Sequence, residues 1–289
     1  MITKTFATIS GVEVLAIMGG WRERVAATFD GLATRYDTRP GGFFVPTSAE
    51  LIELAGLSQG QRVLDVGCGA GACLLGAAPA VAPGGRVTGF DIAPGMAART
   101  ASSAAALGLR NVAVLVGDAS APPFAPGSFD VVLASNVMFL LTSPADAARR
   151  YLHLLPAGGV FAFSWNVAED PAWVPVLAAV DGYAAGGGFS TFLHRPPFNS
   201  AAAMEALLRE CGYVDVVTRQ SVAEIRYPDP EAWWRVSWEQ APALFWSSIP
   251  AASLRAAEKS ALGILEGMRE ADGSVVRHLN FCFIRAVRP

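Results

Sequence analysis

A short run of residues near position 65 combines a carboxylate with closely spaced glycines. The run 63–71 joins an apolar strand to a glycine-rich turn, and Asp65 precedes the first glycine, Gly67, by two positions. Because glycine lacks a Cβ atom, such a turn can be tight and its backbone can lie against a ligand. Gly67, Gly69 and Ala72 also satisfy the G-x-G-x-x-G/A pattern of dinucleotide-binding loops. The turn therefore predicts a nucleotide-containing ligand and leaves its class open.

Two more acidic residues end apolar strands further along the chain. Asp91 closes a predicted strand over residues 86–91, and Asp118 follows a predicted strand over residues 112–117. In an open parallel sheet the carboxyl ends of the strands line the ligand crevice. Three acidic residues at three strand ends can therefore hold one elongated polar molecule at three points.

The elements that must position these acids alternate between strands and helices, which indicates an α/β fold. Further strands are predicted over residues 129–135, 159–164, 213–226 and 277–287. The segment Thr47–Glu50 is expected to be the capping box of a helix. Ser200 and Asp229 are expected to begin two later helices.

Taken together and in this order, the segments resemble the class I S-adenosylmethionine (SAM)-dependent methyltransferases. The resemblance extends from about Tyr36 to Ala162 and includes Phe90–Met96, Phe129–Val132 and Leu154–Gly159. It implies a Rossmann-like three-layer αβα fold with a seven-stranded, mostly parallel sheet whose last strand is reversed. A helical lid built from insertions would cover the cofactor.

The resemblance also implies which residues bind SAM and its product S-adenosylhomocysteine. Asp65 and the glycine loop would hold the methionine part, Asp91 the ribose hydroxyls and Asp118 the adenine amine. Without a ligand, Asp65 has a second interpretation, as a cap of the following turn. The full set of implied cofactor-binding residues is Tyr36, Asp65, Gly67, Cys68, Gly69, Gly71, Asp91, Ile92, Met96, Gly117, Asp118, Ala119 and Asn136.

Two residues are candidates for the chemistry itself. Methyl transfer from a sulfonium requires chiefly that the acceptor be aligned with the methyl group, and a general base is optional. His194 is the preferred base among the three histidines, and Asn136 follows the fourth strand, where it can bond the acceptor or merely complete the strand end. The four cysteines show no paired spacing, and no set of carboxylates typical of magnesium-dependent relatives is present, so no metal is expected.

The acceptor is expected to be an apolar small molecule, because aromatic residues concentrate in two insertions after the fifth strand. The alternative is that these rings only pack the insertions onto the core. The second insertion resembles the lid of the ubiquinone/menaquinone-type and bacterial natural-product methyltransferases. The predicted acceptor-binding residues are Phe139, Trp173, Phe192, Trp234 and Trp238.

One domain of several segments is predicted. Residues 1–45 would form an N-terminal helical lid segment, and residues 167–199 and 228–275 two lid insertions. The remaining segments, 46–166, 200–227 and 276–289, would form the SAM-binding core.

Composition excludes several classes of partner. The net charge of −3 with no basic run argues against a nucleic acid, and no apolar run is long enough to span a membrane. The N-terminal residues do not resemble a secretion signal, so a cytoplasmic location is expected. Whether the chain forms a homo-oligomer is left open.

The sequence therefore predicts a SAM-dependent methyltransferase acting on carbon or oxygen of a hydrophobic, secondary-metabolite or lipid-like acceptor. Three alternatives remain at this point. They are a SAM-binding cyclase of the same fold that transfers no methyl group, an NAD-dependent oxidoreductase, and a binding or regulatory protein.

Overall fold

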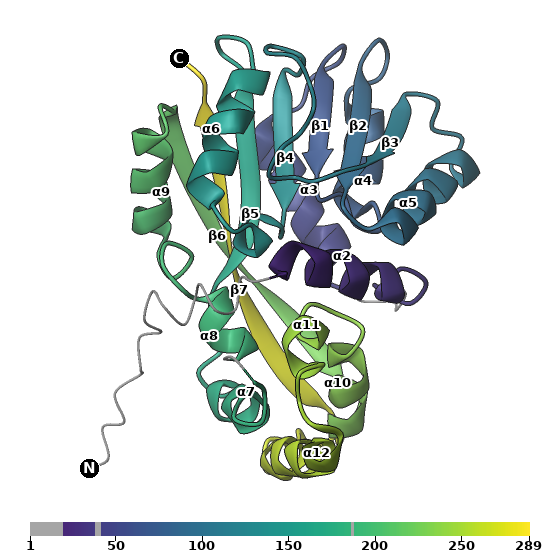
Figure 1. The fold of residues 1–289 in the computed structure, drawn as a ribbon, viewed down its shortest axis with the longest axis vertical. Coiled ribbons are helices and arrows are strands. Elements are labelled where there is room, and N and C mark those ends of the chain that lie inside the picture. The colour runs from purple at the N-terminus through teal and green to yellow at the C-terminus, as the bar shows by residue number, and fades with distance from the viewer. Residues whose placement is uncertain (1–19, 38–41, 186–187) are drawn as a thin grey trace.

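A seven-stranded sheet runs through the protein in the order β3-β2-β1-β4-β5-β7-β6 (Figure 1). The structure, a computed structural model, describes residues 20–37, 42–185 and 188–289. Strands β1 to β5 are parallel, and β7 runs antiparallel to both of its neighbours. The predicted α/β fold with a reversed last strand is therefore confirmed. The strands are β1 (Arg62–Val66), β2 (Arg86–Asp91), β3 (Val112–Val116), β4 (Val131–Ser135), β5 (Val160–Ala168), β6 (Val214–Tyr227) and β7 (Val275–Val287).

Helices cover both faces of this sheet, which gives three layers. Val63 points to the face covered by α3 and α4, whereas its neighbour Leu64 points to the face covered by α6 and α9. Helix α5 packs along β2 and β3. The described helices are α2 (Trp21–Leu32), α3 (Phe44–Ala55), α4 (Ala72–Ala80), α5 (Pro94–Ala106), the 3₁₀ turn η1 (Met138–Leu140), α6 (Pro144–Leu154), α7 (Val174–Asp181), α8 (Phe189–Leu193), α9 (Ala201–Glu210), α10 (Pro230–Ser237), α11 (Ala243–Trp246) and α12 (Ala251–Glu266).

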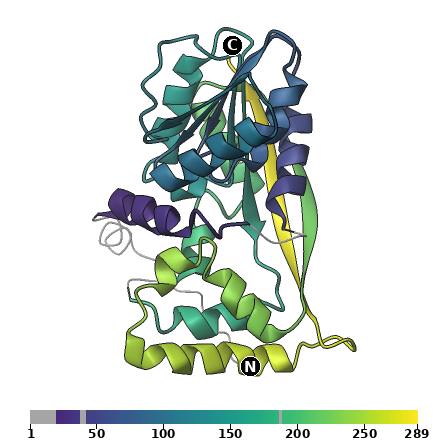
Figure 2. The same ribbon diagram turned by 90° about the vertical axis from the view of Figure 1, so that its right-hand side faces the viewer.

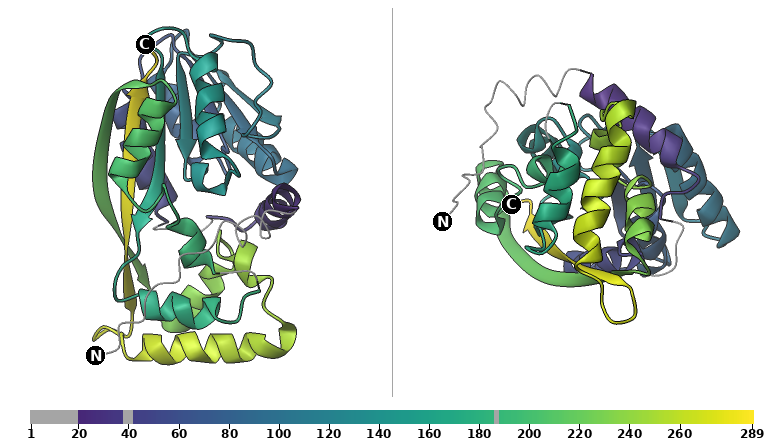
Figure 3. Two further views of the ribbon diagram at one scale, coloured as in Figure 1. Left: turned by 60° about the vertical axis from the view of Figure 1, so that its left-hand side comes forward. Right: turned by 90° about the horizontal axis from the view of Figure 1, so that it is seen from below.

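A helical lobe lies beyond the carboxyl ends of the parallel strands. Strands β6 and β7 are long enough to leave the sheet and reach this lobe, which consists of α7, α8 and α10 to α12 (Figure 2). Helix α12 lies at the end of the lobe farthest from the sheet (Figure 3). The two predicted insertions thus contain the helices of the lobe, while the proposed division of the chain into segments stays a prediction.

Helix α2 lies between the sheet and the lobe (Figure 1). At its start, the Trp21 indole donates a hydrogen bond to the Leu140 carbonyl at 2.7 Å. Near its end, Asp30 accepts one from the Gly95 amide at 2.6 Å. These contacts hold the described part of the predicted N-terminal lid segment against the core; residues 1–19 and 38–41 of that segment lie outside the described residues.

The predicted helix starts were right in two cases and wrong in one. Ser200 and Asp229 cap α9 and α10, accepting the Ala203 amide at 3.3 Å and the Ala232 amide at 2.5 Å. The capping box at Thr47 was wrong, because α3 begins at Phe44 and the Thr47 hydroxyl donates back to the Phe43 carbonyl at 2.7 Å. The helix begins one turn earlier than predicted because the aromatic residues before Thr47 pack on the core. Phe43, for example, contacts Phe281 at a ring distance of 5.5 Å.

None of the helices in the described ranges combines the length and the apolar character needed to cross a membrane.

We predict that Asp229→Ala lowers the free energy of unfolding by about 0.5–2 kcal/mol, because α10 loses its side-chain cap. Thermal or urea unfolding measures the change. Asp229→Asn keeps an oxygen that can cap the helix and is the matched control. Equal losses in both variants would mean that the exposed ion pair of Asp229 with Arg235, and not the cap, matters here.

Candidate functional site

A cavity of about 230 Å³ opens at the carboxyl ends of the parallel strands, between the sheet, α2 and the lobe. Most of the predicted cofactor-binding residues lie in its wall. Gly71 and Gly117 do not: Gly71 precedes α4, and the Gly117 amide donates to the Asp91 carbonyl at 2.8 Å. The predicted residues in the wall are Tyr36, Asp65, Gly67, Cys68, Gly69, Asp91, Ile92, Met96, Asp118, Ala119 and Asn136.

Asp65 is the most unusual of these residues. Its side chain is only 1% exposed, and neither carboxylate oxygen has a hydrogen-bond partner of normal geometry among the described residues. Burial and, to a smaller extent, the nearby Asp91 together raise the pKa of Asp65 to about 8, although the Leu74 amide opposes the shift. A buried carboxylate without a partner is costly. The site is therefore suited to a ligand that brings a positive charge or hydrogen-bond donors to Asp65.

Asp91 fastens the glycine loop to the end of β2. Its two oxygens accept the Gly69 amide at 2.8 Å and the Ala93 amide at 2.9 Å. Burial raises the pKa of Asp91, and these hydrogen bonds partly offset the effect. Gly67 lies in the left-handed region, and a Cβ atom there would come within 2.3 Å of Val137. The loop therefore needs glycine at this position to lie as close as it does to the turn that follows β4.

Asp118 is held from two sides. One oxygen accepts the Ser120 amide at 2.8 Å, and the other pairs with Arg22 of α2 at 3.0 Å. Because Arg22 is largely exposed, this ion pair is weak by itself. It nevertheless brings α2 over the third acidic residue of the site.

The two predicted catalytic residues lie differently with respect to the cavity. Asn136 is in the wall and has a left-handed backbone with φ of 55°, a strained conformation that clusters at functional sites. His194 is not in the wall. Its Nδ1 lies 3.1 Å from the Ser190 carbonyl and its Nε2 lies 3.1 Å from Oδ1 of Asn166, which is in the wall. The role of His194 as a base stays a prediction.

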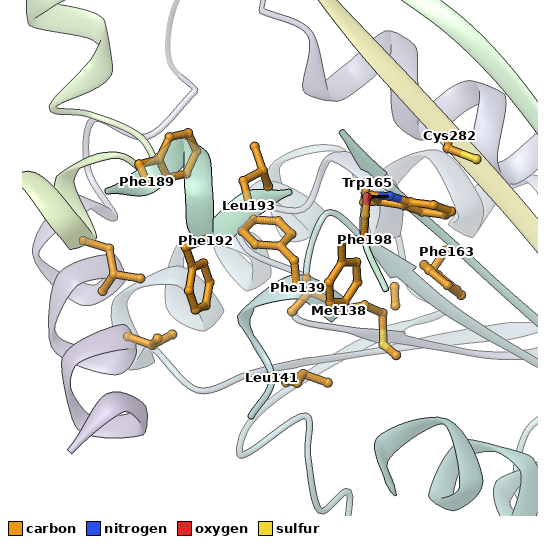
Figure 4. Packing of buried hydrophobic residues seen from close by; sticks show 14 of the residues in the cluster. Met138, Phe139, Leu141, Phe163, Trp165, Phe189, Phe192, Leu193, Phe198 and Cys282 are labelled. Atoms are coloured by element: carbon orange, nitrogen blue, oxygen red, sulfur yellow. Dashed lines mark hydrogen bonds between the residues drawn. The ribbon is translucent and has the colours of Figure 1, made fainter. Parts of the chain in front are cut away.

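The predicted acceptor-binding aromatic residues are mostly outside the wall. Phe139 lines the cavity, whereas Phe192 packs on Trp21 at a ring distance of 4.8 Å. Figure 4 shows Phe189, Phe192 and Leu193 of α8 in one cluster with Met138 and Phe139. The lobe tryptophans pack on one another, and the stacked pair of Trp234 and Trp246 has a ring distance of 5.5 Å. Neither Trp173, Trp234 nor Trp238 is in the wall, so the structure brings them to the lobe core; their role in binding an acceptor is untested.

Sequence reasoning missed several wall residues on the extended strands. Ile225 and Tyr227 of β6 and Arg277, Leu279 and Phe281 of β7 line the cavity. They alternate along their strands, so they share one face of the paired strands β6 and β7. That period-two pattern was available in the sequence, but nothing in it showed that this strand pair would leave the sheet and form a wall. The same holds for Asn166, which lies on β5 beyond the predicted end of that strand.

Within the described ranges, no group of three or more His, Cys, Asp or Glu side chains is arranged to hold a metal ion.

Comparisons with known proteins agree with this geometry. A family described as "Methyltransferase domain" matches residues 63–159. Nocamycin O-methyltransferase of Saccharothrix syringae is 36% identical over 233 residues, which cover 76% of this chain and 83% of that protein. Aklanonic acid methyltransferase DauC of a Streptomyces species is 40% identical over 144 residues, covering 50% of this chain and 66% of that protein. The chain therefore belongs to the class I SAM-dependent methyltransferases.

Solved structures support the fold. The YcgJ protein of Bacillus subtilis has a TM-score of 0.59 at 19% identity, covering 84% of this chain and 98% of that one. The [4+2]-cyclase SpnF has a TM-score of 0.53 at 18% identity, covering 94% of each chain. At this identity the cyclase shows that the fold is shared and nothing about the reaction. The protein is an enzyme, a SAM-dependent methyltransferase, and the oxidoreductase alternative is set aside.

We predict that Asp65 makes the ligand-free protein less stable as the pH rises. The folded-state pKa of about 8 lies above the unfolded value of about 3.9, so the folded state binds the extra proton between these values. Stability therefore falls as pH rises from about 4 to about 8. Asp65→Asn should remove this part of the slope, measured by thermal unfolding between about pH 5 and about pH 8. Identical slopes for the two proteins would show that Asp65 is compensated in the folded state.

Proposed function

We propose that this enzyme transfers the methyl group of SAM to an oxygen or carbon atom of a hydrophobic small molecule. The observation that carries the proposal is the buried Asp65, whose oxygens have no hydrogen-bond partner of normal geometry within the part of the chain that the structure describes. Asp65 lies in the wall of a cavity that continues between apolar side chains. An ammonium group, such as that of the methionine part of SAM, would supply the missing partner. The names of the two curated relatives, nocamycin O-methyltransferase and aklanonic acid methyltransferase, favour an oxygen atom of a natural product.

The residues of the chain can divide the cofactor between them as the resemblance implies. Asp65 would bind the ammonium group, Asp91 the ribose hydroxyls and Asp118 the adenine amine. Asp91 retains acceptor capacity for this purpose, since each of its oxygens has several lone-pair sites and accepts one amide. Ile92 and Met96 of the wall would flank the adenine ring.

When bound, SAM supplies an electrophilic methyl group, and the remaining work is alignment and exclusion of water. Apolar residues of the wall that do not belong to the glycine loop, among them Phe139, Phe189 and Leu193, would hold the acceptor. Such alignment alone accounts for a large share of a displacement rate. A base is needed only for an acceptor that must lose a proton.

The test is binding followed by transfer. Calorimetry should show that S-adenosylhomocysteine binds, and Asp91→Ala should weaken binding by about 1.5–3 kcal/mol for each hydrogen bond lost to the charged carboxylate. Asp130→Ala is the control, because Asp130 pairs with Arg62 away from the cavity wall. Binding of NADH without binding of S-adenosylhomocysteine would refute the proposal. Labelled SAM with aklanonic acid as first acceptor then tests transfer.

We also predict that the reaction needs no metal ion, because displacement at a sulfonium requires no Lewis acid and the sequence has no recognisable ligand set. Activity after exhaustive EDTA treatment and gel filtration should equal that of untreated enzyme. Activity that is lost and then restored by magnesium or zinc would contradict the prediction.

A further inference from the structure

A buried ion pair lies at the wall of the cavity. Arg277 of β7 and Glu169, which follows β5, have side chains only 9% and 4% exposed. Nε and Nη2 of Arg277 donate to the two Glu169 oxygens at 3.0 and 2.6 Å. Removing both charges from water is costly, and well-packed apolar residues often serve stability equally well. Because stability does not explain a buried ion pair at this place, we looked to ligand binding for its role.

Arg277 contacts Glu169 and also faces the cavity. It lies in the wall with Tyr227, and its charge partly offsets the rise that burial causes in the pKa of the Tyr227 hydroxyl. Burial is the largest single effect on Arg277 and opposes its charge, but Glu169 together with Tyr227 and Asp170 outweighs burial, and the pKa of Arg277 is raised. The guanidinium is therefore charged, and its Nη1 takes no part in the pair with Glu169.

Asn166 is a second polar residue of this wall, and His194 holds it. Both nitrogens of the His194 ring face oxygens, at Ser190 and at Asn166. Burial lowers the pKa of His194 even though Glu169 lies near enough to raise it, so the ring is neutral and has a single N–H. If Nδ1–H donates to the Ser190 carbonyl, Nε2 carries no hydrogen and must accept a hydrogen bond. The Asn166 side chain provides this bond when its NH₂ group points toward Nε2. The amide oxygen of Asn166 is then left for another donor.

We propose that Arg277 and Asn166 form the polar end of the acceptor site and together bind one neutral hydroxyl group of the acceptor. A hydroxyl can accept from Arg277 and donate to Asn166. The group is neutral because Glu169 already balances Arg277, and a second carboxylate would add an uncompensated charge in a buried place. Glu169 and His194 are positioning residues. This inference rests on the proposed function, which supplies the apolar acceptor.

A matched pair of probes tests the polar end separately from the apolar pocket. Equilibrium dialysis of the enzyme saturated with S-adenosylhomocysteine measures binding of 2-naphthol and of naphthalene. Naphthalene reports the apolar pocket, and the ratio of the two affinities reports the hydroxyl site. We expect 2-naphthol to bind at least about tenfold more tightly, as a hydrogen bond to a charged group would give.

Variants assign the preference to residues. The double variant Arg277→Met/Glu169→Gln removes both charges together, so no single charge is left buried, and it should abolish the preference while naphthalene affinity is unchanged. Asn166→Leu and His194→Phe should each reduce it. Arg226→Met is the control, because Arg226 is an exposed neighbour on β6 that is not in the cavity wall.

The outcomes separate the two proposals. Equal binding of both probes, or a preference that survives in the double variant and in Asn166→Leu, would overturn the polar end and leave the apolar acceptor site intact. Tighter binding of 2-naphthoate than of 2-naphthol would overturn the neutral hydroxyl. Failure of both probes to bind would remove the apolar pocket and the inference with it. If His194 were the base, His194→Phe would change the pH profile of turnover without changing the probe preference.

Discussion

Burying a carboxylate is unfavourable, and the strands around Asp65 impose this cost on it. Among the described residues its oxygens have no hydrogen-bond partner of normal geometry, and its pKa is raised to about 8. Strand β1 lies between β2 and β4, so the end of β1 is covered on both sides by backbone. The residues before Asp65 are fully buried and leave it no path to solvent along its own strand. The fold thus contains a locally unfavourable arrangement at the place where a cationic group of the cofactor is proposed to bind. Such arrangements are typical of functional sites.

The other acidic residues of the site depend on the same arrangement. Asp91 ends the neighbouring strand, and its bonds to Gly69 and Ala93 bind the glycine loop to β2. These hydrogen bonds fix where the loop runs past Asp65, and they hold Asp91 close enough to raise the pKa of Asp65. Asp91 therefore holds the loop in place and is also a proposed ribose ligand. Holding a turn and binding a ligand, the two interpretations that the sequence left open for Asp65, are thus compatible roles for one acidic residue.

The accuracy of sequence-based prediction followed the range of the interactions. Strand β2 was predicted to the residue, because an apolar run and a closing acidic residue are local signals. The end of β5 was predicted four residues early, since its last residues pair with Phe281 and Asn280 of a strand more than a hundred positions away. The Arg277–Glu169 pair is invisible in sequence for the same reason. Trp173 could be recognised as an aromatic of the lobe, but not as a core residue whose indole donates to the Val276 carbonyl at 2.7 Å.

The extended, paired strands β6 and β7 link these observations. One part of the pair completes the sheet, and the other part leaves the sheet and carries Tyr227 and Arg277 along the cavity. A strand pair that belongs to both regions transmits the rigidity of the sheet to the cavity wall, because its backbone pairing continues without a break from Thr218 to Tyr227. Helix α2, in contrast, is attached through side chains, among them Trp21, which packs on Phe192 and bonds to Leu140, and Arg22, whose pair with Asp118 is exposed. Local opening requires less free energy at such an element than along a continuous strand pair. The access path for ligands is therefore expected on the α2 side, opposite a wall that stays in place.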